Sequence, residues 1–77
     1  MPYRVEVYEQ MLGPGQQPFR TGRHLPESFL DREDARAGIM RHIRDQQLPR
    51  SGENEEKGYW WARRNGDDRN AIFVIVG

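Results

Sequence analysis

Residues 59–76 read YWWARRNGDDRNAIFVIV, and this stretch decides the fold. The segment Tyr59–Arg64 predicts a β-strand, because aromatic side chains are enriched in strands. Asn65-Gly66 is a strong signal for a tight turn between antiparallel strands. The segment Ala71–Val76 is apolar at every position, which is typical of a central strand covered on both faces. The stretch therefore predicts a hairpin whose second strand lies inside a sheet.

The N-terminal part of the chain predicts a further strand and a weaker one. Side chains alternate along Tyr3–Tyr8, so that Val5 and Val7 share one side with Tyr3. A period of two indicates a strand with one buried face. Residues 13–15, Gly-Pro-Gly, then break the chain. The segment Phe19–Arg23 predicts a short strand at an edge of the sheet, because a proline precedes it and a glycine lies within it.

The segment 31–47 predicts the helix of the chain. Asp31 suits the N-cap position, because its carboxylate can accept hydrogen bonds from free backbone N–H groups. Apolar side chains recur every four residues at Ala35, Ile39 and Ile43, and this spacing defines the face that packs on the sheet. We expect the helix to end before the proline at position 49, because a residue that precedes proline avoids the α region.

The segment 50–58 is polar and rich in Glu, and it predicts a flexible connector. A chain of 77 residues is long enough for one domain. We therefore expect a single α+β domain over residues 1–77. Its sheet has three to four strands, mainly antiparallel, with one helix packed on one face and the element order ββαββ.

Composition excludes several classes of function. The formal net charge is +0, which argues against a generic polyanion binder. There is no cysteine, so neither a disulfide framework nor thiolate chemistry is available. The longest apolar run, 71–76, is far shorter than the roughly 20 residues of a membrane-spanning helix, and no segment resembles a signal peptide. We expect a cytoplasmic protein without a membrane partner.

No catalytic or metal-binding constellation is recognisable in the sequence. Neither Ser28 nor Ser51 lies in the strand-turn-helix motif of serine hydrolases. His24 and His42 stand alone, without the cysteines that complete most zinc sites. The glycines at positions 13 and 15 lack the spacing of a phosphate-binding loop. We therefore expect no enzyme activity, no metal and no cofactor.

One feature of the sequence leads toward function. A single helix covers only one face of a sheet, yet the last two predicted strands carry large apolar side chains on both faces. An exposed apolar face commonly marks an interaction site. The candidate binding residues are the aromatic and arginine side chains of these strands: Tyr8, Tyr59, Trp60, Trp61, Arg63 and Arg64. Because neighbouring strand residues face opposite ways, only one tryptophan lies outward. The sequence does not choose between Trp60 and Trp61, although the shared face of Trp61 with Tyr59 and Arg63 favours Trp61 as the outward one.

Three classes of function remain open. The first is a non-catalytic protein-interaction or self-associating module, whose partner is another protein or a second copy in a weak homodimer. The alternative is a nucleic-acid-binding module, in which strand aromatics stack on bases and arginines bind phosphates. The second alternative is a small enzyme or ligand carrier, although one sheet with one helix offers little concavity for a pocket.

Overall fold

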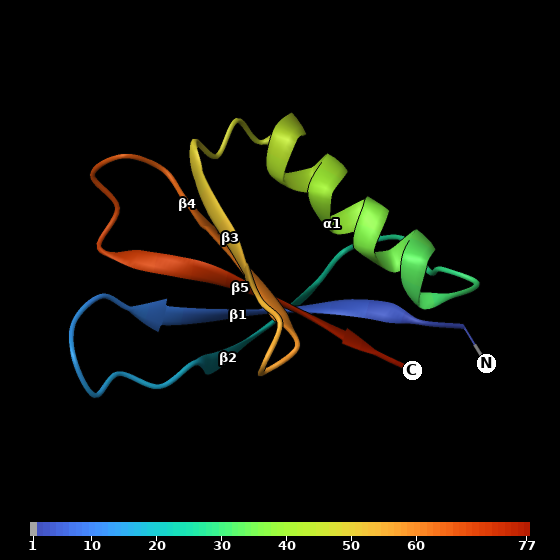
Figure 1. Ribbon diagram of the computed structural model, residues 1–77, viewed down its shortest axis with the longest axis horizontal. Coiled ribbons are helices and arrows are strands. Elements are labelled where there is room, and N and C mark those ends of the chain that lie inside the picture. The colour runs from blue at the N-terminus through green and yellow to red at the C-terminus, as the bar shows by residue number, and fades with distance from the viewer. Residues whose placement is uncertain (1) are drawn as a thin grey trace.

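In the computed structural model, which describes residues 2–77, one helix lies on one face of an antiparallel sheet of five strands (Figure 1). The elements along the chain are β1 (Arg4–Met11), β2 (Phe19–His24), α1 (Arg32–Asp45), β3 (Arg50–Asn54), β4 (Tyr59–Arg63) and β5 (Arg69–Val76). Their order across the sheet is β2-β1-β5-β4-β3. The α+β class is therefore confirmed, and the apolar strand β5 is central, as its composition predicted.

The expected strand count and element order are wrong in detail, because residues 2–77 form five strands in the order ββαβββ. The additional strand is β3, which occupies residues 50–54 of the segment expected to be a connector. β3 pairs with β4 alone and forms an edge of the sheet. Edge strands are commonly short and polar, so composition does not separate them from loops. The mobility of this segment stays a prediction.

The β3–β4 connection is a tight turn held by backbone and side-chain hydrogen bonds. The Gly58 N–H donates to the Asn54 carbonyl oxygen at 2.8 Å, and the Lys57 N–H donates to Asn54 Oδ1 at 3.0 Å. Gly58 has a φ of 75°, which is a conformation that glycine adopts without a steric cost. At the opposite edge, β2 pairs with β1 alone, as expected of a strand interrupted by glycine.

Helix α1 begins and ends with identifiable caps. Asp31 Oδ1 accepts from the Asp34 N–H at 2.8 Å, which confirms the predicted N-cap. At the C-terminus, Gln47 takes a left-handed conformation with φ 54°, and the Leu48 N–H donates to the Ile43 carbonyl at 3.1 Å. This pattern is a Schellman cap. The helix therefore ends at Asp45, slightly before the predicted boundary.

The hydrophobic core lies between α1 and the sheet. Ile39 is fully buried, and Ala35, Gly38 and Ile43 share its side of the helix. Gly38 allows the close approach of a ring, because a Cβ at this position would lie 2.4 Å from Phe29 Cζ. The sheet and the β2–α1 connection supply the other buried side chains of this core: Val5, Leu25, Phe29, Trp60, Ala62, Phe73 and Ile75. Within residues 2–77, no helix is long and apolar enough to cross a membrane.

Candidate functional site

The face of the sheet turned away from α1, here called the open face, carries two adjacent rows of side chains. The register of β3, β4, β5, β1 and β2 sets the first row, the aromatic row, which contains Gly52, Trp61, Ile72, Tyr8 and Arg20. The second row, the polar row, is displaced from the first by two residues on each strand, toward the β1–β2 and β4–β5 connections. It contains Arg50, Arg63, Asn70 and Gln10. On the other side of the aromatic row, Tyr59 pairs with Val74.

Ile72 forms the floor of the aromatic row. It is 1% exposed, although it lies on the face that α1 does not cover. The side chains around it on the open face therefore bury it. Trp61 is one of these, and its indole comes close to β3 because position 52 is glycine. A Cβ on Gly52 would lie 2.6 Å from Trp61 Nε1. The open face is thus a built surface, with aromatic rings packed down on an aliphatic floor.

Two arginines of the polar row lie directly opposite each other. Arg50 and Arg63 are cross-strand partners, and neither forms an ion pair within the described residues. Arg50 Nε donates instead to Asn65 Oδ1 at 3.1 Å. Like charges at directly opposed positions destabilise a sheet. In the same row, Asn70 Oδ1 is buried without a hydrogen-bond partner. The fold alone does not account for either feature.

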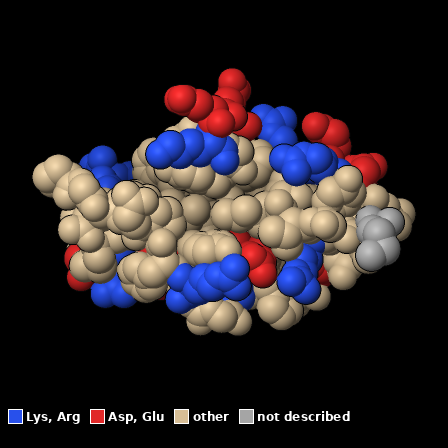
Figure 2. All heavy atoms as spheres, turned by 90° about the horizontal axis from the view of Figure 1, so that it is seen from below, with Lys and Arg blue, Asp and Glu red and all other residues tan. Residues whose placement is uncertain are grey.

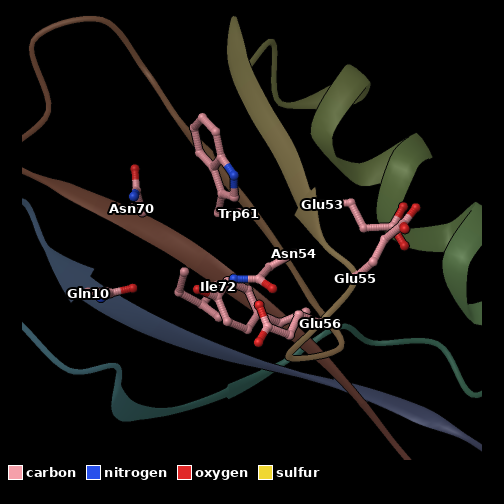
Figure 3. A pocket seen from close by; sticks show the side chains of 9 residues that line it. Gln10, Glu53, Asn54, Glu55, Glu56, Trp61, Asn70 and Ile72 are labelled. Carbon is pink, nitrogen blue, oxygen red and sulfur yellow. Dashed lines mark hydrogen bonds between the residues drawn. The ribbon is translucent and has the colours of Figure 1, made fainter.

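A hollow of about 540 Å³ opens between these rows and the β3–β4 turn. Gln10, Asn54, Trp61, Asn70 and Ile72 line it from four neighbouring strands (Figure 3). Their amide groups surround an apolar floor. The surface therefore offers hydrogen-bonding groups at the sides of an aromatic and aliphatic centre.

The carboxylates near this hollow divide between the two faces. Glu53 turns toward α1, where its carboxylate pairs with Arg36 at 3.1 Å (Figure 3). Glu56 borders the hollow on the open face and forms no ion pair within residues 2–77. The hollow thus has an unpaired carboxylate at the turn and unpaired guanidinium groups beyond its opposite end.

The two ends of the strands on the open face carry side chains of opposite charge. One end carries Arg50 and Arg63, whereas Arg20 lies in the aromatic row, with its guanidinium carbon 6.0 Å from the centre of the Tyr8 ring. The other end carries Glu56 and also Glu6, which pairs with Arg4 at 3.5 Å. Seen from below the view of Figure 1, uncharged side chains form a band along the molecule, with both basic and acidic side chains on either side of it (Figure 2).

Four of the six predicted binding residues, Tyr8, Tyr59, Trp61 and Arg63, come together on the open face. The expectation that Trp61 lies outward agrees with the structure, in which it is half-buried on this face.

The other two predicted binding residues, Trp60 and Arg64, lie outside the candidate site. Trp60 is 5% exposed and lies in the core under α1. Arg64 follows the end of β4 and donates to the Gln46 carbonyl at the end of α1, at 3.3 Å.

Sequence reasoning missed two arginines of the open face. Arg50 fell in the expected connector, and Arg20 fell in a weak strand whose register was undefined. The sequence held no signal for Arg50, because the segment RSGEN of β3 lacks the alternation of apolar and polar residues that indicates a strand.

The geometry does not single out catalytic chemistry. Within residues 2–77, no three His, Asp or Glu side chains lie close enough together to hold a metal ion. No protein-family model, no curated protein and no solved structure matches this chain. The candidate site therefore rests on the arrangement of the open face itself.

Proposed function

We propose that this protein is a non-catalytic interaction module that self-associates through the open face of its sheet. The observation that carries the proposal is the aromatic row, in which Trp61 and Tyr8 lie half-buried over Ile72 on the face without a helix. Tryptophan, tyrosine and arginine dominate the energetics of protein interfaces. All three residue types lie together here.

The charges of the open face favour a second copy of the chain as the occupant. A two-fold axis running across the strands would bring the Arg50 and Arg63 end of one copy opposite the Glu56 end of the other. The unpaired guanidinium groups of Arg50 and Arg63 would then face the unpaired carboxylate of Glu56, which would offset part of the like-charge contact between the two arginines. An isologous interface requires this kind of self-complementarity.

The expected association is weak. Burial of apolar surface contributes about 25 cal/mol per Å², and the aromatic side chains of the open face are already half-buried, which limits the apolar area that a partner can cover. Lost translational and rotational freedom offsets much of the gain on association. We expect a dimer with a Kd between about 1 µM and about 1 mM.

Sedimentation equilibrium over a range of concentrations tests this proposal. The wild-type mass should rise toward that of a dimer, and Arg63→Glu should keep the chain monomeric. The double variant Arg63→Glu with Glu56→Arg should regain association, because it exchanges the two charges. Arg32→Glu, an exposed change at the start of α1, is the matched control and should leave association unchanged. A monomer at about 1 mM, or no rescue by the double variant, would reject the two-fold arrangement.

The same arginines favour a second candidate function, binding of single-stranded nucleic acid. The polar row could contact phosphates while the neighbouring Trp61 and Tyr8 stack on bases. Binding of a labelled oligonucleotide should then weaken as salt rises, and Arg50→Ala with Arg63→Ala should reduce the salt slope. The net charge of +0 and the carboxylate of Glu56 at the far end of the face favour the protein partner. Salt-sensitive micromolar binding would reverse this order.

A further inference from the structure

A second hollow, here called the helix-end hollow, lies on the opposite face of the sheet. Helix α1 crosses that face obliquely and ends at Asp45, which leaves the end near the β1–β2 and β4–β5 connections without a helix above it (Figure 1). The hollow measures about 370 Å³ and lies between the C-terminal part of α1 and the sheet. This volume falls within the range of pockets for small molecules.

Two small side chains leave room for the hollow. Ala62 and Ala71 are cross-strand partners on the helix face, whereas the next pair along the same strands, Trp60 and Phe73, fills its space with large rings. The floor of the hollow is therefore apolar and is formed by the two alanines and Phe73, with Val7 beside them. Such a floor suits a planar apolar group.

His42 forms part of the wall above this floor. Its ring stands edge-on to Phe73, with centroids 5.5 Å apart and an interplanar angle of 70°. The side chain is half-buried, and its ring forms no hydrogen bond with any residue that the structure describes. A half-buried imidazole at the wall of a hollow can donate to a bound molecule.

The rim of the hollow carries a small excess of positive charge. Its side chains include three guanidinium groups and two carboxylates: Arg23, Arg64, Arg69, Glu9 and Asp67. Glu9 accepts from Arg23 at 2.8 Å and from Arg69 at 3.0 Å, so these three groups hold one another in place. Arg64 forms no ion pair within residues 2–77 and reaches across to the Gln46 carbonyl at 3.3 Å. Arg63 also borders the hollow without an ion pair, but its register position opposite Arg50 places it on the open face, so Arg64 is the cation available to a ligand.

We propose that the helix-end hollow binds a small monoanion with a flat apolar body, of which an aromatic carboxylate is the simplest chemical form. The ring would lie on Ala62 and Ala71, and the carboxylate would meet Arg64 with His42 beside it. Planar guanidinium groups bind carboxylates through two parallel hydrogen bonds. This inference stands on a different face from the proposed interaction surface and does not depend on it.

The probe for this site is 2-naphthoate, followed by chemical shifts of the ¹⁵N-labelled protein. We expect saturable shifts at Ala62, Ala71 and His42. The neutral isostere 2-naphthamide should bind about tenfold more weakly, because it lacks the charge-assisted hydrogen bonds. Equal binding of the two probes, absence of shifts at about 10 mM naphthoate, or shifts confined to Trp61 and Tyr59 would overturn the proposal.

Two variants test separately how the floor and the rim of the hollow contribute to naphthoate binding. Ala71→Leu should fill the hollow and abolish naphthoate binding, and its spectrum shows directly whether the chain remains folded. Arg64→Ala removes only a rim cation, so it tests the site even if the larger side chain disturbs the sheet. It should weaken naphthoate binding about tenfold and leave naphthamide binding unchanged. Arg32→Ala, which removes an exposed cation elsewhere, should change neither. Unaltered naphthoate binding in Arg64→Ala would contradict the proposed role of the rim.

Discussion

The two faces of the sheet use neighbouring tryptophans in opposite ways. Trp60 is 5% exposed under α1, whereas Trp61 lies half-buried on the open face and is held down against a glycine of β3. Both residues come from one strand and have the same side chain. The burial of each therefore depends on the element that covers it, and the same aromatic residue type closes the core on one face and leaves a binding surface on the other.

Charged side chains follow the same division. On the helix side, Glu9 is paired with Arg23 and Arg69, and Glu53 is paired with Arg36. On the open face, cross-strand guanidinium groups have no carboxylate partner within the described residues. These carboxylates of the helix side are thus paired within the chain, whereas the cross-strand guanidinium groups of the open face are left for a partner.

The largest expected effect is on the covered face. Ile39→Ala removes a fully buried side chain between α1 and the sheet, and it should lower the free energy of unfolding by about 2–5 kcal/mol. Met40→Ala, at the next position on the same helix, changes a side chain that is 48% exposed. It should change the free energy of unfolding by no more than about 0.5 kcal/mol. Denaturant unfolding of both variants measures the contrast, and similar losses would mean that the helix face is wrongly assigned.

A matched pair of glycines compares the tolerance of the two faces. A Cβ at Gly38 would overlap the buried ring of Phe29, so Gly38→Ala should destabilise the protein by about 1–3 kcal/mol. A Cβ at Gly52 would overlap the indole of Trp61, which can move outward because its face is open. Gly52→Ala should therefore cost less stability but shift the tryptophan fluorescence toward that of a solvated indole. A greater loss at Gly52 would show that the open face is packed as rigidly as the core.

A charge reversal on the open face should separate stability from binding. Arg63→Glu places a carboxylate opposite Arg50. A cross-strand ion pair should then raise the free energy of unfolding by about 0.2–1 kcal/mol, even though self-association is lost. The same reversal at Arg69, which already contacts Glu9 and Asp68, should lower stability instead. Thermal unfolding at low protein concentration should show a raised midpoint for Arg63→Glu and a lowered midpoint for Arg69→Glu.

The smallest effect concerns Asp68 in the β4–β5 turn. Arg69 donates to its carboxylate at 3.1 Å, and this hydrogen bond, together with the charge of the guanidinium, holds the pKa of Asp68 below its usual value. Arg69→Gln should raise that pKa, as followed by NMR titration of the carboxyl carbon. A lowered pKa contributes stability above the unfolded pKa that is lost as pH falls through the folded one. Because Asp68 is exposed, we expect no measurable change in the unfolding midpoint.

Much of the fold could be predicted because its signals are local. The N-cap at Asp31, the spacing of Ile39 and Ile43 and the apolar run of β5 each depend on residues close together in the chain. The strand β3 could not be predicted, because five polar residues at a sheet edge have the composition of a loop. Its membership of the sheet comes from backbone pairing with β4, which leaves no mark on side-chain type.

The features of the candidate site likewise fall into those that the sequence determines and those that depend on tertiary structure. The sequence by itself determined that aromatic strands exceed what one helix can cover, that Trp61 and Tyr59 share a face, and that cysteine chemistry is absent. Only the tertiary structure decided that Arg50 lies opposite Arg63, that Arg64 turns away toward α1, and that two alanines leave a hollow beyond the end of the helix. Alternation along one strand is a local property, whereas the register between strands and the reach of a helix depend on contacts between residues far apart in the chain.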